Sequence, residues 1–195
     1  MIIKNQSGIP KNSNKMDLEY LKQIGIKTSL ARRLSREIQT MEKEKPEYQI
    51  RVFHDRINEK TEVKIQKDKI ILTFLIPTDY PFKSPVILWN DKIYRNMLIW
   101  KTKYFQNVLQ DNGIKCLCCD SFLCTGNWSP TITIPKLIGE ITKNKNLTLA
   151  ILRTRLVRQI TASKGIHCPE ITELILNFLI EGTKPIVRPY AITSE

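Results

Sequence analysis

The sequence predicts an α+β protein, with a four-stranded antiparallel meander sheet, an N-terminal helix and C-terminal helices. Apolar residues recur at helical spacing before residue 46 and after residue 130, which predicts helices on both sides of the sheet in sequence. Between these positions apolar and polar residues alternate, as they do in strands that bury one face. Short polar turns separate the alternating runs, and turns this short favour antiparallel pairing.

The N-terminal part of the chain is predicted to contain a polar arm and two helices. Residues 1–15 are polar and are expected to form a flexible arm. Asp17 is the expected cap of a short helix within 16–25, and a longer helix is predicted over 28–45. The apolar stripe expected on the longer helix is Leu30, Leu34, Ile38 and Met41. Its other face carries Arg32, Arg33 and Arg36.

Strands and then further helices are predicted in the rest of the chain. The strands are expected at 48–53, 61–66, 69–77 and 84–89. Three helices are predicted later, at 131–143, 146–160 and 168–182. The apolar stripe expected on the second of these is Leu149, Leu152, Leu156 and Ile160.

We expect one domain rather than two, because a chain of 195 residues is long enough for a single sizeable core. The core is expected over 16–145, with 146–195 as a helical extension of the same domain. Hydrophobic content of 42% and charged content of 26% are ordinary for a soluble globular protein. No apolar run approaches the roughly 18 residues that a membrane span needs, so no membrane association is expected.

The net charge of +12 favours acidic partners. The basic residues are spread along the chain and are not interleaved with stacking aromatics, so nucleic acid is not the expected partner. Much of the charge is expected to be solvated surface, and an acidic protein surface is the other candidate partner. The first residues lack the apolar core of a signal peptide. An intracellular, reducing and cytoplasmic location is therefore expected, in which disulfides are rare.

Four of the five cysteines lie within residues 116–124, and their chemistry has several interpretations. Four thiolates favour structural zinc, but the order C-x-C-C, four residues, then C differs from the paired C-x-x-C of most zinc knuckles. A redox C-x-x-C needs an alternating α/β setting that this sequence lacks. Buried structural cysteines and a single nucleophilic thiol are the remaining interpretations. The four residues are Cys116, Cys118, Cys119 and Cys124.

The segments on both sides of these cysteines resemble the ubiquitin-conjugating enzyme (UBC-like) family. "LIPTDYPFKSPVI" (75–87) is similar to the family signature F-P-x-D-Y-P-F-x-P-P, and "NWSPTITIPKLIGEI" (127–141) is similar to W-S-P-A-L-T-I-x-x-V-L-x-x-I. The family places its catalytic cysteine between these two segments in a G-x-I-C-L context, where this chain has "GIKCLC" (113–118). The resemblance covers roughly 28–145 and implies a UBC-like fold.

The resemblance implies that Cys116 is the catalytic nucleophile. Cys116 keeps the family's distance from Gly113 and is followed by a leucine. Cys118 and Cys119 are the register alternatives, because each aligns with a different variant of the family pattern. Trp128 is expected to bury its ring beneath this segment.

The resemblance also implies an asparagine whose amide stabilises the oxyanion when a lysine attacks. The family's H-P-N triplet is absent from this chain. Asn107, nine residues before Cys116, is the preferred substitute, and Asn96 is the competing one. The remodelled loop is reminiscent of conjugating-enzyme-like proteins encoded by large DNA viruses, which would place this chain in the host cytoplasm. A turn containing three prolines is expected to be packed by Tyr80 and Phe82.

The function that the resemblance implies is a ubiquitin-conjugating transferase. Its cysteine accepts ubiquitin as a thioester from an activating enzyme and passes it to a substrate lysine, without a metal or cofactor at this step. The expected partners are ubiquitin, the activating enzyme, a ubiquitin ligase and protein substrates, with the arginines of the longer helix docking the activating enzyme. The alternative is a catalytically inactive UBC/RWD-like binding module, which the missing triplet favours, or a version in which the cysteine cluster binds zinc.

Overall fold

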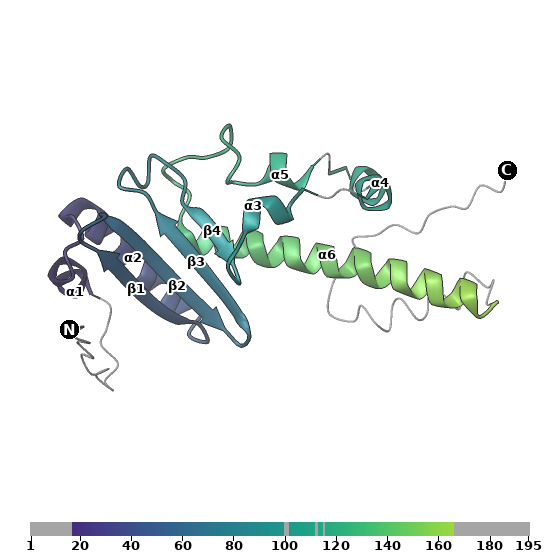
Figure 1. The fold of residues 1–195 in the computed structure, drawn as a ribbon, viewed down its shortest axis with the longest axis horizontal. Coiled ribbons are helices and arrows are strands. Elements are labelled where there is room, and N and C mark those ends of the chain that lie inside the picture. The colour runs from purple at the N-terminus through teal and green to yellow at the C-terminus, as the bar shows by residue number, and fades with distance from the viewer. Residues whose placement is uncertain (1–16, 100–101, 112, 115, 166–195) are drawn as a thin grey trace, which may run out of the picture.

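The computed structural model describes residues 17–99, 102–111, 113–114 and 116–165, and its mixed α+β class is the predicted one. The predicted arm at 1–15 and the predicted helix at 168–182 lie outside the described residues. Figure 1 shows the described elements and their labels. In chain order these are α1 (Leu18–Gln23), α2 (Thr28–Glu44), β1 (Gln49–Asp55), β2 (Lys60–Lys67), β3 (Ile70–Ile76), β4 (Val86–Trp89), β5 (Lys92–Ile93), α3 (Tyr94–Met97), α4 (Lys103–Asp111), α5 (Leu117–Asp120) and α6 (Ile134–Ser163).

The sheet is an antiparallel meander of five strands in the order β1-β2-β3-β4-β5, so the prediction of four strands was wrong by one. The additional strand, β5, forms a tight hairpin with β4, in which Trp89 pairs with Lys92. The two residues between them, Asn90 and Asp91, both have positive φ, 45° and 65°. Two such residues make a type I′ turn, for which asparagine and aspartate are favoured. β5 is two residues long and exposed, so it lacks the alternation that revealed the other strands.

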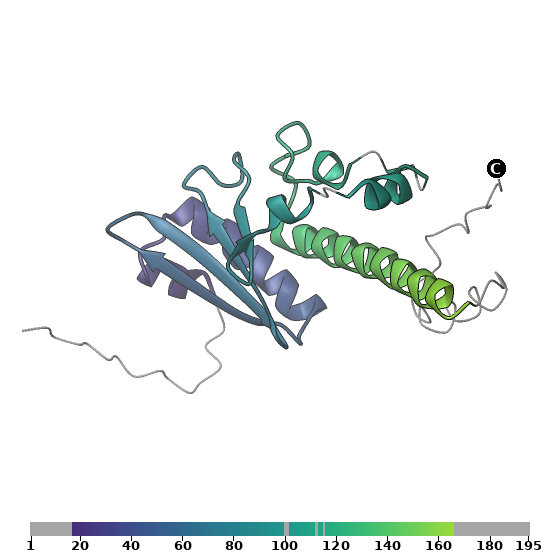
Figure 2. The same ribbon diagram turned by 45° about the vertical axis from the view of Figure 1, so that its right-hand side comes forward.

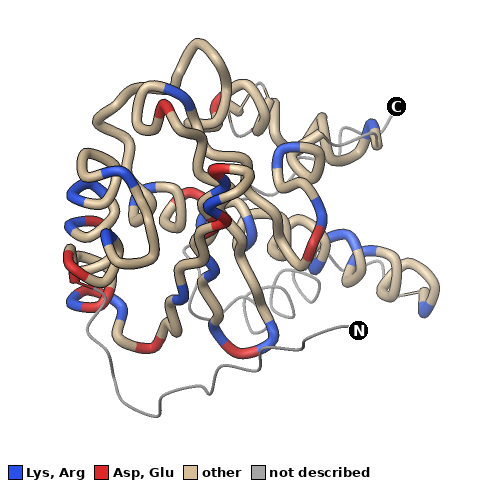
Figure 3. Tube along the Cα trace, turned by 60° about the vertical axis from the view of Figure 1, so that its left-hand side comes forward, with Lys and Arg blue, Asp and Glu red and all other residues tan. Residues whose placement is uncertain are grey.

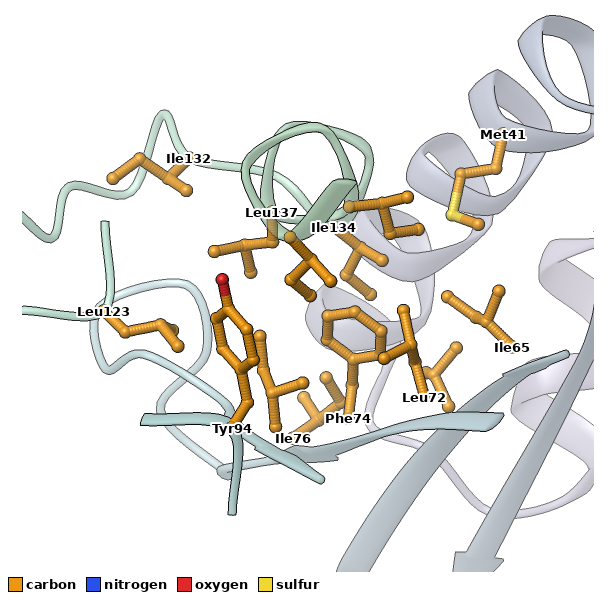
Figure 4. Packing of buried hydrophobic residues seen from close by; sticks show 14 of the residues in the cluster. Met41, Ile65, Leu72, Phe74, Ile76, Tyr94, Leu123, Ile132, Ile134 and Leu137 are labelled. Atoms are coloured by element: carbon orange, nitrogen blue, oxygen red, sulfur yellow. The ribbon is translucent and has the colours of Figure 1, made fainter. Parts of the chain in front are cut away.

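Helix α2 packs against one face of the sheet, behind the strands in the view of Figure 1. All four residues of its predicted stripe are buried, which confirms that prediction. The strands contribute alternate residues to the same core, among them Val63, Ile65, Leu72 and Phe74. Figure 4 shows Phe74 and Tyr94 pointing toward Ile134 and Leu137 at the start of α6. The core therefore joins α2, the sheet and α6.

One continuous helix, α6, replaces the two helices predicted at 131–143 and 146–160. Thr133 caps its first turn by accepting a hydrogen bond from the N–H of Lys136 at 3.4 Å. The polar stretch around Asn144 resembled a break between helices, but Asn144 is buried and its amide donates to Tyr94 Oη at 2.9 Å. The expected boundary at 145/146 falls within this helix. Figure 2 shows α6 extending well beyond the sheet, with α4 and α5 on one side of it.

The second half of α6 buries a different face from the predicted one. Leu147 and Ile151 belong to the same buried cluster as Phe105 and Val108 of α4. Apolar residues occur on more than one face of this part of the helix, so periodicity alone does not identify the buried face. The predicted stripe, which is Leu149, Leu152, Leu156 and Ile160, is exposed.

A buried carboxylate, that of Glu37 in α2, joins three parts of the fold. It accepts hydrogen bonds from Tyr80 Oη, 2.9 Å from each carboxylate oxygen, and from the N–H of Ile134 at 2.8 Å. Arg33 forms an ion pair with the same carboxylate. Burial and the Glu37 charge raise the pKa of Tyr80. Helix α2, the loop after β3 and the start of α6 are thus held together by one group.

Arg33 is partly buried at this junction, with its side chain 28% exposed, whereas the sequence placed it only on the face of α2 opposite the apolar stripe. Its guanidinium donates to the carbonyls of Pro130 at 3.0 Å and Ile132 at 3.2 Å. Burial lowers the pKa of Arg33, but the charge and hydrogen bond of Glu37 outweigh burial and raise it overall. The other two arginines of this face, at positions 32 and 36, are exposed.

The charged residues of the described chain are spread over its helices and its sheet rather than gathered on one element (Figure 3). Figure 3 shows Lys and Arg on the helices and the strand hairpins, with Asp and Glu among them. Within the described ranges, no helix combines the length and the apolar content that crossing a membrane requires.

Candidate active site

The segment that carries the cysteines begins where α4 ends. Gly113 has a positive φ of 74°, which a residue without a β-carbon adopts at no steric cost. Its N–H donates to the carbonyl of Gln110 at 2.9 Å, and the N–H of Ile114 donates to the carbonyl of Leu109 at 2.8 Å. This pair of hydrogen bonds is a Schellman motif, which ends a helix and turns the chain sharply. The turn leads directly to the first cysteine.

Cys116 is partly buried at the N-terminal end of α5. Its backbone is extended, with φ −164° and ψ 127°, and it is the N-cap residue of that short helix. Its carbonyl accepts a hydrogen bond from the N–H of Asp120 at 3.0 Å. The next residue, Leu117, is buried in the main core. Cys116 is therefore held at the start of a helical turn whose first residue, Leu117, is anchored in the core.

Three sulfurs converge at this point. The Sγ atoms of Cys116, Cys118 and Cys119 all lie within 4.8 Å of one another. Cys116 Sγ is 2.6 Å from Cys118 Sγ, which in turn is 3.9 Å from Cys119 Sγ. All three are free thiols, and so is Cys124, which is not a member of this close set. The structure thus brings together the predicted nucleophile and both of its register alternatives.

The three thiols differ in their readiness to ionise. The hydrogen bond from Cys118 lowers the pKa of Cys116 most, burial opposes it, and the backbone N–H groups of residues 119 and 118 lower the pKa further, so that it is lowered overall. The same contact raises the pKa of Cys118 to about 12. Contact with Cys116 also raises the pKa of Cys119. Because the thiolate is the nucleophilic form, the electrostatics favour Cys116 among the three.

The chain after α5 is fixed by two polar side chains that the sequence did not reveal. The carboxylate of Glu140 in α6 accepts hydrogen bonds from Ser121 Oγ and from the N–H of Phe122, both at 2.7 Å. The amide of Asn127 donates to the carbonyls of Cys119 at 2.6 Å and Ser121 at 3.1 Å. These contacts hold the cysteine-bearing turn against α6.

The two segments with a family resemblance meet in space through Trp128. Its indole N–H donates to the carbonyl of Pro81 at 2.9 Å, and its ring lies 6.2 Å from that of Tyr80. Tyr80 is buried, as predicted, but Phe82 is 77% exposed, so the expectation that it packs the turn was wrong. Trp128 itself is only partly buried, although it packs against the core. The loop after β3 and the cysteine loop therefore support each other.

A shallow groove of about 300 Å³ lies beside Cys116. The described residues that line it include Gln106 and Gln110 of α4, and Asn107 is not one of them. Asn107 is exposed on α4, and Asn96 is exposed on α3. The oxyanion role of Asn107 stays a prediction. The two glutamines were not considered from the sequence, although their spacing of four residues places them on one helical face.

We compared the chain with models of known protein families, with curated proteins and with solved structures, and none of the three comparisons found a match.

Proposed function

We propose that the protein is a ubiquitin-conjugating transferase in which Cys116 carries ubiquitin as a thioester. The observation that carries this proposal is the position of the thiol: a partly buried sulfur of lowered pKa, beside a groove, between two segments that resemble the family. The order of the described elements also fits the proposal. A helix, an antiparallel meander, an irregular segment with the thiol and a long helix follow one another in the order that the resemblance implies.

The proposed reaction exchanges one thioester for another. The Cys116 thiolate attacks the carbonyl carbon at the ubiquitin C-terminus, a new carbon–sulfur bond forms, and the cysteine of the activating enzyme leaves as a thiolate. In the second step the amine of a substrate lysine attacks the same carbon. The carbon–nitrogen bond forms, Cys116 leaves as a thiolate, and the lysine nitrogen loses a proton to solvent or to a nearby base.

A rigid support for the thiol is the second argument for this function. Positioning alone contributes strongly to a reaction between two bound groups. The hydrogen bonds from Asn127 and to Glu140 fix the cysteine turn, and the Trp128–Pro81 bond fixes the loop beside it. Buried cysteines with a purely structural role would not need a groove or polar clamps of this kind.

The alternative is a non-catalytic binding module with the same architecture. The exposed position of Asn107 outside the groove favours this alternative, because no asparagine in the described part of the groove is aimed at Cys116. Gln106 and Gln110 line the groove together with Cys116, and a side-chain amide is the type of donor that stabilises an oxyanion.

The test of the proposal is a transfer assay with activating enzyme, ATP and ubiquitin, analysed on a non-reducing gel. The proposal predicts an adduct that reducing agent removes, and Cys124→Ala, the matched control outside the close set, should form it at an unchanged rate. If the wild-type protein forms no adduct but binds free ubiquitin without covalent attachment, the binding-module alternative is correct.

A further inference from the structure

The three converging sulfurs have dimensions that suit a metal ion. In a thiolate site with zinc–sulfur bonds of about 2.3 Å, the sulfurs lie about 3.8 to 4.0 Å apart in tetrahedral or trigonal geometry. Cys118 Sγ and Cys119 Sγ are 3.9 Å apart, and all three sulfurs of the set lie within 4.8 Å of one another. The contact between Cys116 Sγ and Cys118 Sγ, at 2.6 Å, must open by about an ångström to reach that spacing.

The backbone of this segment preorganises the three sulfurs before any ion is present. Cys116 is the N-cap residue of α5, and Cys118 and Cys119 belong to its only turn. The buried Leu117 fixes the turn to the core, while Asn127 holds the carbonyl of Cys119. A metal ion would therefore meet its ligands nearly in place, which reduces the entropic cost of binding.

We propose that Cys116, Cys118 and Cys119 form a three-thiolate site for one thiophilic metal ion of the zinc and cadmium class. Soft thiolate ligands select such ions over hard cations. Binding replaces the S–H protons with metal–sulfur bonds, so protons are released to solvent as the ion enters. The three proposed ligands are the cysteines of the C-x-C-C sequence, and Cys124 is not among them because it lies outside the close set.

The proposed metal site has a consequence for the thiol chemistry. The Cys116 sulfur cannot bind a metal ion and carry ubiquitin at the same time, so metal occupancy would block thioester formation. This consequence rests on the proposed function, whereas metal binding itself does not.

Cadmium titration of the full-length chain tests the site without any other protein. The chain is prepared metal-free under reducing conditions as the Cys168→Ser variant, because Cys168 lies outside the described residues. Cadmium binding is followed by the ultraviolet charge-transfer band of the thiolate–cadmium bond, and iodoacetamide alkylation with peptide mass spectrometry then shows which sulfurs are protected. We expect one equivalent of cadmium, with protection of the three named cysteines and alkylation of Cys124.

Single substitutions give the matched comparison. Loss of a residue that only supports a metal ligand weakens metal binding by up to about 100-fold. Cys119→Ser removes a ligand itself, so it should weaken cadmium binding by more than about 100-fold. Cys119 is exposed, so this change leaves the fold intact, which circular dichroism checks. Cys124→Ser should change the affinity by less than about threefold.

Two results would overturn the site. One is the absence of the charge-transfer band at stoichiometric cadmium, and the other is a loss with Cys124→Ser as large as that with Cys119→Ser. Zinc added to the cadmium-loaded protein should displace cadmium and remove its ultraviolet charge-transfer band. If zinc does not displace cadmium, the site is restricted to cadmium, which contradicts a site for both zinc and cadmium. A protein that forms the ubiquitin adduct but does not bind cadmium would disprove the metal site alone, and the reverse result would disprove the proposed function alone.

Discussion

Replacement of Glu37 by glutamine should destabilise the protein strongly, because this carboxylate is the common acceptor of a buried junction. Its side chain is 4% exposed. It accepts hydrogen bonds from Tyr80 Oη and the N–H of Ile134, and it forms an ion pair with the guanidinium of Arg33. Glutamine has nearly the same shape but no charge, and one of its two polar ends is a donor that faces other donors.

The magnitude follows from what the substitution leaves unpaired. Removing one partner of a buried ion pair costs about 3 to 5 kcal/mol. Arg33 is partly exposed and can turn toward water, which places the cost at the lower end of that range. The backbone N–H of Ile134 has no such freedom, and an unsatisfied buried donor costs about 1 to 3 kcal/mol. The two costs are not added, because the carbonyl oxygen that glutamine keeps can still accept one of these hydrogen bonds. We therefore expect a total loss of about 3 kcal/mol for Glu37→Gln, the lower end of the ion-pair range.

Urea unfolding followed by circular dichroism measures this loss, with Glu42→Gln as the matched control on the same helix. Glu42 is exposed, and its replacement should change the free energy of unfolding by less than about 0.5 kcal/mol. In a thermal scan the loss from Glu37→Gln corresponds to a fall in Tm of about 6 to 12 °C for a chain of this size.

A double-mutant cycle tests the reasoning more closely. Tyr80→Phe alone should cost about 1 kcal/mol, and in the Glu37→Gln background it should cost clearly less, because its partner is already changed. The reasoning is refuted if Glu37→Gln costs no more than Glu42→Gln, or if the effects of the two substitutions at the junction simply add.

Three further predictions concern packing, the loop contact and pH. Ile151→Ala should cost about 2 to 5 kcal/mol in urea unfolding and Leu152→Ala less than about 0.5 kcal/mol, since these neighbours are 1% and 44% exposed; equal costs would mean that the buried face of α6 is misassigned. Trp128→Phe, which keeps an aromatic ring but loses the 2.9 Å hydrogen bond, should cost about 1 kcal/mol and slow adduct formation, and an unchanged rate would contradict its supporting role. Burial raises the pKa of Tyr80 and Tyr94 in the folded protein. The stability that their neutral phenols provide is therefore complete below about pH 10 and falls above it, where the phenols of the unfolded chain ionise. Urea midpoints should then fall less steeply with rising pH for Tyr80→Phe than for the wild type.

Local patterns predicted the parts of the fold in which one face of an element is buried. The buried stripe of α2 and the alternation in the strands were predicted correctly, because each of these elements has a polar face opposite an apolar one. The junction at Glu37 was not predicted, since it depends on a tyrosine 43 positions away in sequence. The continuity of α6 was missed for the same reason, because Asn144 is satisfied by Tyr94, which is 50 positions away.

The candidate site could be located from the sequence but not built from it. The flanking segments singled out the cysteine-bearing stretch, and the structure places these segments in contact through Trp128. The sequence left open which sulfur is the nucleophile, because the choice depends on hydrogen bonds between Cys116 and its neighbours. The contribution of Gln106 to the groove depends on the angle at which α4 meets the cysteine turn, which no local pattern encodes.

The measurement that tests the central claim most directly is adduct formation by three single variants in the transfer assay with activating enzyme, ATP and ubiquitin. The account predicts that Cys116→Ala abolishes the reducible adduct, whereas Cys118→Ala and Cys119→Ala retain it, with intact mass confirming one ubiquitin per chain. A reducible adduct that persists in Cys116→Ala and disappears in either of the other two variants would contradict the assignment of Cys116 as the thiol that carries ubiquitin.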